Sequence, residues 1–105
     1  MELRRTPRAP IDLPVAFVSK AQETDRRGGR AKDISLGGMF VETVDPPSFG
    51  AEVVIELTLP GQRSAFAIPG VVRWTHPDGM GVQFRTLSAR ETFAITEIVR
   101  ASEGR

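Results

Sequence analysis

Apolar and polar residues alternate along short segments of this chain, a pattern typical of β-strands that bury one face. The most regular alternation lies in residues 51–60, and similar patterns occupy residues 13–20 and 79–86. The residues that these three strands are expected to turn inward are Leu13, Val15, Phe17, Val53, Ile55, Leu57, Leu59, Met80, Val82 and Phe84.

Glycine and proline divide the rest of the chain into further strands and turns. Residues 63–75 predict a strand with a bend or bulge at Pro69-Gly70, and two more strands, in RAKDIS and GMFVETV, flank a tight turn. Residues 21–29 have no apolar period and end in two glycines, which predicts a mobile loop.

The pattern changes to a helical period near the C-terminus. Ser88 followed by Glu91 forms a capping box, which predicts a helix over residues 88–101. The apolar residues that share one face of this helix are Ala94, Ile95, Ile98 and Val99. Six short strands followed by such a helix predict an all-β fold, a small antiparallel barrel that is closed or nearly closed.

The composition narrows the range of functions. The chain has 105 residues, of which 40% are hydrophobic and 26% charged, as in an ordinary globular domain. It has no cysteine and one histidine, which argues against disulfides, thiol catalysis and two-histidine metal sites. No apolar stretch approaches the roughly 20 residues of a membrane span, and the polar N-terminus does not resemble a secretory leader. We therefore expect one soluble, cytoplasmic domain over residues 1–105, without catalytic activity, metal or cofactor.

Charge is unevenly distributed although the formal net charge is only +1. Residues 1–32 carry a net charge of +4, and residues 33–105 carry −3. A chain this close to neutrality does not suit a protein that coats duplex DNA, whose affinity comes from neutralising many phosphates. A local basic cluster on a neutral body suits a small anionic ligand, although a basic tail is more commonly just a solvated tail.

The basic cluster is rich in arginine. Arg4, Arg5 and Arg8 lie within the segment LRRTPR, directly before the first predicted strand. A guanidinium group can hold a phosphate, or the O6/N7 edge of guanine, with two parallel hydrogen bonds. Pro7 and Pro10 stiffen the segment and so reduce the entropy lost when it becomes ordered.

A second polar cluster lies in the segment DISLGG at the end of a predicted strand. Asp33 and Ser35 are two positions apart, so their side chains leave an extended chain on the same face. Their oxygens can accept hydrogen bonds from a guanine, while Gly37 and Gly38 permit positive φ and let a ligand approach the backbone. The alternative is a simple turn in which the two side chains bond their own backbone.

The two clusters together match a known signature, RxxxR followed by [D/N]xSxxG. The first part runs from Arg4 to Arg8 and the second from Asp33 to Gly38, and GVVRWT and GMGVQF follow in the expected order. With these segments the chain resembles the PilZ family, bacterial receptor domains for the second messenger cyclic di-GMP. The resemblance covers nearly the whole chain, and both parts of the signature are intact.

The resemblance implies a six-stranded antiparallel barrel of the Greek-key type with a C-terminal helix, and no catalysis. By position, Arg4 and Arg8 would clamp the guanine edges and phosphates of cyclic di-GMP, and Arg5 would add a third cation. Asp33 and Ser35 would read a guanine, and the residue that shapes the turn beside them is Gly38. The implied divisions are a flexible ligand-binding segment over residues 1–10, a barrel over 11–86 and a helix over 88–101.

Several further residues near these motifs have open roles. Trp74 is the only tryptophan, and it either stacks on a base or packs in the core. The alternation places Val72 and Trp74 on one face and turns Arg73 outward, toward the ligand. The remaining secondary candidate is Gly37. His76 and Asp78 are expected to be solvated turn residues.

The hypothesis is a switch. Binding of cyclic di-GMP would order the N-terminal arginine segment and create a surface through which an unidentified effector protein receives the signal. One alternative is a protein-interaction module that acts without a ligand. A small nucleic-acid-binding barrel is a further alternative, which is not favoured because most of the six phenylalanines fall on inward faces and residues 51–86 are not basic.

Overall fold

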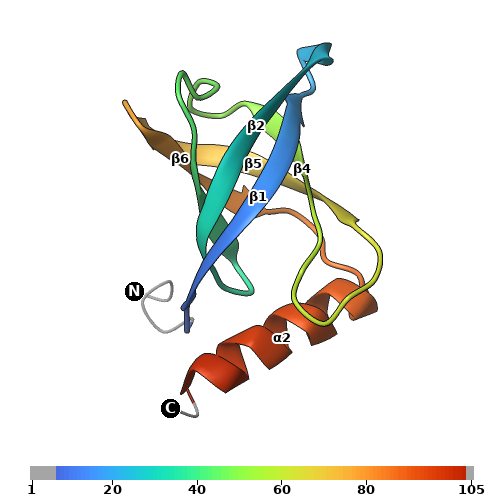
Figure 1. Ribbon diagram of the computed structural model, residues 1–105. Helices are drawn as coiled ribbons and strands as arrows, with labels where there is room; N and C mark the ends of the chain where they lie inside the picture. The colour runs from blue at the N-terminus through green and yellow to red at the C-terminus, as the bar shows by residue number, and fades with distance from the viewer. Residues whose placement is uncertain (1–6, 104–105) are drawn as a thin grey trace.

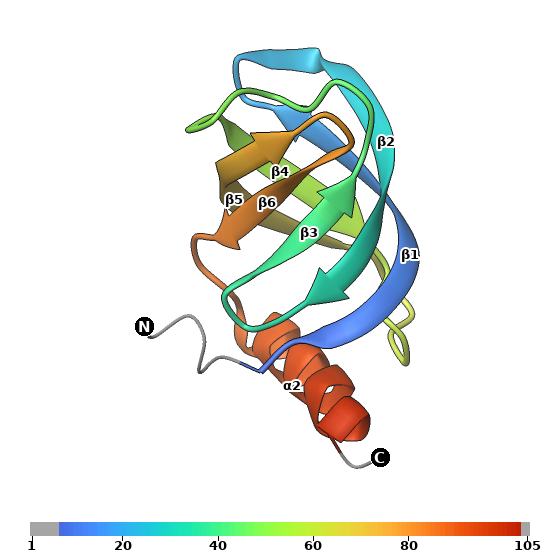
Figure 2. The same cartoon turned by 90° about the vertical axis from the view of Figure 1, so that its left-hand side faces the viewer.

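Six antiparallel strands form a closed barrel, in the order β1-β2-β3-β6-β5-β4, and helix α2 lies across one end (Figures 1 and 2). The computed structural model describes residues 7–103. Its elements are β1 (Ala9–Ser19), β2 (Gln22–Ile34), β3 (Gly38–Glu42), β4 (Glu52–Leu57), β5 (Phe66–His76), β6 (Gly79–Phe84) and α2 (Ala89–Glu103). Because β3 pairs with β6 and not with β4, the segment between β3 and β4 crosses the end of the barrel opposite α2. The predicted fold class is confirmed.

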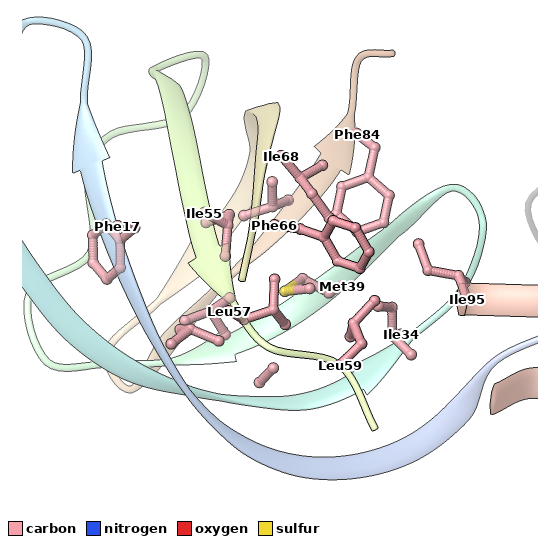
Figure 3. Packing of buried hydrophobic residues seen from close by; sticks show 14 of the residues in the cluster. Phe17, Ile34, Met39, Ile55, Leu57, Leu59, Phe66, Ile68, Phe84 and Ile95 are labelled. Carbon is pink, nitrogen blue, oxygen red and sulfur yellow. The ribbon is translucent and has the colours of Figure 1, made fainter. Parts of the chain in front are cut away.

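The hydrophobic core fills the barrel, as the alternation predicts. All four inward residues of the 51–60 segment are buried, and so are Val15, Phe17, Met80, Val82 and Phe84, while Leu13 is partly buried. Figure 3 shows the larger of these side chains together with Ile95 of α2. The helix therefore closes one end of the barrel with its apolar face, of which Ala94, Ile95 and Val99 are buried and Ile98 is partly buried.

Helix α2 begins with the predicted capping box. The backbone N–H of Glu91 donates to Ser88 Oγ at 3.1 Å, and the backbone N–H of Ser88 donates to Glu91 Oε1 at 2.8 Å. These bonds satisfy backbone donors that the first turn of a helix leaves without partners. The helix continues to Glu103, two residues beyond the predicted end. Within residues 7–103, no helix has the length and apolar character needed to cross a bilayer.

The loop predicted for residues 21–29 is wrong, because residues 22–29 belong to strand β2 and only Ala21 lies in a turn. The first half of β2 is exposed on both faces, so its sequence carries no apolar period, and the backbone ladder with β1 holds it in place. Strand β1 also begins earlier than the predicted barrel boundary at residue 11: Ala9 is buried and pairs with Ile34. Residues 9 and 10, which were predicted to belong to the N-terminal ligand-binding segment, are therefore part of β1, and residues 1–6 of that segment lie outside the described residues.

A bend or bulge was predicted at Pro69-Gly70, and the structure has no bulge there. Both residues pair in regular register with β4, and the irregularity lies further along β5, between Val72 and Trp74. These two residues face the consecutive residues Val82 and Gly81 of β6, so Arg73 is the extra residue. A bulge of one residue reverses the side-chain alternation beyond it. Trp74 is consequently 47% exposed, and the prediction that it shares an inward face with Val72 is wrong.

The turn between β2 and β3 has room for a side chain at Gly37 but not at Gly38. A Cβ atom on Gly38 would overlap the carbonyl oxygen of Val82 on β6, whereas one on Gly37 would have Ser35 Oγ as its nearest neighbour, at 3.7 Å. Neither glycine adopts a positive φ, so the expectation that these positions need glycine for a left-handed backbone conformation is wrong. Gly38 is required because β3 and β6 approach each other closely.

We predict that Gly38→Ala lowers the free energy of unfolding by about 1–3 kcal/mol, since the added methyl group forces β3 away from β6. The matched control is Gly37→Ala, which should change the unfolding free energy by less than about 0.5 kcal/mol. Guanidinium denaturation of both variants and the parent protein measures this difference. Equal stabilities for the two variants would contradict the close approach described here.

Candidate ligand-binding site

The two predicted polar clusters meet in space through Arg8, Asp33 and Ser35. Arg8 Nη2 lies 2.6 Å from Asp33 Oδ1 in an ion pair, and Arg8 Nη1 lies 3.5 Å from Ser35 Oγ. Arg8 directly precedes β1, whereas Asp33 and Ser35 lie at the end of β2, 25 and 27 residues further on. The antiparallel pairing of β1 with β2 brings the two ends together. The other predicted arginines, Arg4 and Arg5, lie outside the described residues.

Ser35 is fully buried, and its hydroxyl organises the turn. The backbone N–H groups of Gly37 and Gly38 donate to Ser35 Oγ at 3.1 and 3.3 Å, and this hydroxyl lies 3.4 Å from the carbonyl oxygen of Gly38. The turn interpretation is therefore correct for Ser35. The same hydroxyl also lies beside Arg8, so the turn and the candidate site are one structure.

Asp33 connects this turn to β3. Its Oδ1 atom accepts hydrogen bonds from the backbone N–H of Phe40 at 3.2 Å and from Arg8 at 2.6 Å. The side chain remains 35% exposed. Because both bonds are to Oδ1, the carboxylate presents its second oxygen as an acceptor for a ligand.

A groove of about 500 Å³ extends from these residues over the outer face of β3, β6 and β5. Its volume falls in the range of small-molecule sites. Besides Arg8, Asp33 and Ser35, the lining includes Gly37, Gly38, Phe40, Arg73, Trp74, His76, Asp78, Gly81 and Gln83. The groove thus contains each predicted site residue that the structure describes, including the secondary candidates Gly37, Arg73 and Trp74.

Aromatic rings form one wall of the groove. Phe40 on β3 and Trp74 on β5 both pair with Gly81 on β6, and their rings stack with centroids 5.4 Å apart and an interplanar angle of 11°. A Cβ atom on Gly81 would overlap the indole ring of Trp74, so the ring can lie flat only because that position is a glycine. Core packing of Trp74 is ruled out by its exposure, and the ring is accessible to a ligand.

Sequence reasoning missed Phe40 and assigned His76 only to a solvated turn. The His76 ring lies 5.2 Å from that of Trp74 and 5.8 Å from that of Phe40, and its Nδ1 donates to Asp78 Oδ1 at 2.6 Å. One signal in the sequence points to Phe40: it alternates with the inward residues Met39 and Val41 and must therefore lie on the outer face.

Basic side chains on the outside of β2 are paired with carboxylates away from the groove. Arg30 Nε donates to Asp12 Oδ1 at 2.6 Å, and Lys32 Nζ lies 3.4 Å from the same atom. The hydrogen bond from Arg30 is the main reason that the pKa of Asp12 lies below its ordinary value. Arg26 forms a further pair with Glu56 at 2.6 Å. These charges are compensated within the protein.

A second hollow, of about 560 Å³, lies between β1 and the β4–β5 region. Its lining is mostly apolar, and the charged groups beside it are Arg26 and Glu56, which neutralise each other. It therefore lacks the unpaired polar groups that orient a charged ligand. Within residues 7–103, no three metal-ligating side chains of histidine, cysteine, aspartate or glutamate gather in one place. The groove at Arg8 is the better candidate site.

Known structures share this fold. The PilZ domain of CeSA from a cellulose-synthesizing bacterium matches with a TM-score of 0.70 and 20% identity, over 91% of this chain and 97% of that one. The PilZ domain of Escherichia coli YcgR with c-di-GMP matches with a TM-score of 0.73 and 19% identity, over 96% and 92%. The Bacillus subtilis inhibitor of motility, MotI/DgrA, matches with a TM-score of 0.75 and 19% identity, over 97% of this chain and 52% of that protein.

The sequence itself identifies the family. No curated protein matches it, but the family model described as PilZ domain matches residues 2–103, which is nearly the whole chain. The matched region includes both parts of the signature and all of the described groove. This chain therefore belongs to the PilZ domain family, a family of non-catalytic receptor domains for cyclic di-GMP.

Proposed function

We propose that this chain binds cyclic di-GMP in the groove at Arg8 and passes the signal to an effector protein in the cytoplasm. The observation that carries the proposal is the meeting of Arg8 with Asp33 and Ser35 at one end of a groove of suitable size. A dianionic ligand with two guanines requires cations, a carboxylate acceptor and flat apolar surface. All three are present along this groove.

Each side chain has a distinct role in this proposal. The guanidinium of Arg8 holds a phosphate or a guanine edge, together with Arg4 and Arg5 from the preceding residues. Asp33 accepts hydrogen bonds from the ring N–H and amino group of a guanine. Ser35 and Gly38 keep the turn in shape beside it, and Gly37 leaves space for the base.

The outer face of β5 supplies further contacts. The ring of Trp74 is half-exposed and lies flat against β6, so a guanine can stack on it. Arg73 also lines the groove, where its charge favours the anionic ligand. The same exposed rings are compatible with bases of single-stranded nucleic acid, which makes an oligonucleotide the natural competitor in a binding experiment.

The ion pair between Arg8 and Asp33 suggests how binding acts as a switch. Both groups are engaged with each other at 2.6 Å, so a ligand that uses both must separate them. In the proposed complex the ligand takes the place of each partner and orders residues 1–8 over the groove. A ligand shifts a conformational equilibrium only through its different affinity for the two states. The ordered segment then forms part of a new surface for the effector.

We predict that Arg8→Ala weakens binding of cyclic di-GMP by about 2–4 kcal/mol, which is roughly thirty-fold to a thousand-fold in Kd. Titration calorimetry on the parent protein and the variant measures the loss. The matched control is Arg30→Ala, which also removes an exposed, ion-paired arginine but lies outside the groove. It should bind as the parent protein does.

Retention of the parent affinity in Arg8→Ala would reject the role of this residue. Absence of binding to the parent protein itself would reject the proposed ligand. In that event, tight binding of a single-stranded oligonucleotide would favour the nucleic-acid alternative. Binding to neither ligand would favour an interaction module that acts without a ligand.

Trp74 provides a direct optical test, because it is the only tryptophan in the chain. We predict that cyclic di-GMP changes its fluorescence in step with the calorimetric titration, and that Trp74→Ala weakens binding by about 1–3 kcal/mol through loss of a stacked base. Trp74→Phe keeps a flat ring and should retain most of the affinity. Phe93→Ala removes an exposed ring of α2 outside the groove and should change neither signal. Saturable binding without any fluorescence change would show that the base does not stack on Trp74.

A further inference from the structure

A small depression adjoins the groove on the outer face of β5 and β6. Its volume is about 350 Å³, and it is lined by Val71, Arg73, Gln83, Phe84, Arg85 and Thr86. Arg73 and Gln83 also line the main groove, so the two hollows adjoin each other at these side chains. The depression thus extends the proposed ligand site toward Arg85.

The strand register places Arg73 and Arg85 on opposite sides of this depression. Val71 pairs with Gln83, and the backbone N–H of Arg85 donates to the carbonyl of Pro69 at 2.9 Å. Arg85 therefore follows Gln83 by two positions on the same outer face. Arg73 is the bulged residue that follows Val71 and Val72. Its Nε atom donates to Gln83 Oε1 at 2.7 Å, which fixes the guanidinium and leaves its terminal nitrogens available.

These two arginines differ from most others in the described chain. Arg8, Arg26, Arg27, Arg30 and Arg100 each form an ion pair with a carboxylate. Among residues 7–103, neither Arg73 nor Arg85 has a carboxylate partner within 4.0 Å. Glu52, the register partner of Val71 on β4, has its carboxylate 4.0 Å from Lys20 Nζ. Two guanidinium groups that have no carboxylate partner in the described part of the chain thus flank a hollow of a size that admits a phosphate group.

We propose that Arg73 and Arg85 form a phosphate-binding site that extends the groove. The site takes a phosphodiester or phosphate anion, which each guanidinium can hold with two parallel hydrogen bonds. Strand β3 lies between Asp33 on β2 and this site on β6 and β5, so the two sites contact different parts of a bound ligand. Its assignment to cyclic di-GMP rests on the proposed function, but its affinity for a phosphate anion does not.

The first experiment tests the anion site without any nucleotide. Inorganic pyrophosphate is titrated into the isotope-labelled full chain, and the NMR signals of backbone amides and arginine Nε–H groups are followed. We expect saturable shifts centred on Arg73, Gln83 and Arg85. The double variant Arg73→Gln/Arg85→Gln should lose them, whereas Arg63→Gln, which removes an exposed arginine of the β4–β5 loop, should keep them. Shifts that do not saturate, or that persist in the double variant, would overturn the proposal.

The second experiment asks whether the site serves the nucleotide. Calorimetry with cyclic di-GMP should show that the double variant binds about tenfold or more weakly than the parent protein and Arg63→Gln. Unchanged stoichiometry assigns the site to a phosphate of the ligand in the groove, whereas a halved stoichiometry assigns it to a second bound molecule. Unchanged affinity and stoichiometry would overturn the assignment to cyclic di-GMP. If the parent protein binds pyrophosphate but no cyclic di-GMP, the proposed function fails and the anion site stands.

The variants must remain folded for these comparisons. Both arginines are exposed, so their replacement by glutamine leaves the core unchanged. Dispersed amide spectra of the double variant that overlay those of the parent protein away from the depression verify this. Replacement by lysine, as Arg73→Lys/Arg85→Lys, keeps the charge and removes the planar fork. It should recover part of the pyrophosphate affinity, and no recovery relative to the glutamine variant would overturn a site based on charge.

Discussion

The candidate site depends on one extra residue in β5. Without the bulge at Arg73, the alternation of the strand would place Trp74 inside the barrel, opposite Met80. With it, the indole ring lies on the outer face and stacks against Phe40, over a glycine that leaves room for the ring. A bulge has no stabilising contact of its own, since it interrupts the ladder and leaves one residue unpaired. The bulge instead determines side-chain direction: it turns two adjacent side chains, Arg73 and Trp74, toward the same groove.

The ion pair between Arg8 and Asp33 holds the Arg8 side chain in place but adds little to the stability of the fold. Both side chains are substantially exposed, at 48% and 35%, and surface ion pairs of this kind contribute only about 0–1 kcal/mol. A ligand can therefore separate them at small cost and replace each bond with one of its own. Meanwhile the pair keeps Arg8 beside the groove. The buried hydroxyl of Ser35, in contrast, is held in place, because it contacts three backbone groups of the turn.

Local patterns in the sequence were sufficient for the core and the helix, whereas the resemblance to the family was needed to assign the two signature motifs to one site. The alternation of β4 and the capping box at Ser88 act through near neighbours, so they can be read directly. Strand β2 could not be predicted in this way, since its first half buries neither face and is held by its ladder with β1. The bulge was misplaced for a related reason: it is defined by the register with β6, which no segment of β5 reveals alone. For this reason the sequence did not identify His76 as part of the groove.

The closed barrel restricts where a ligand can cause movement. Backbone ladders link all six strands in a ring, and a shift of one strand by a residue would turn its core side chains outward. The floor of the groove, built from β3, β6 and β5, is therefore rigid on the scale of ligand binding. Among the described residues, the groups at the groove that the ladders do not hold are exposed side chains such as Arg8 and Trp74. Under the proposed function, an effector that senses the ligand therefore has to contact these side chains or the ligand itself.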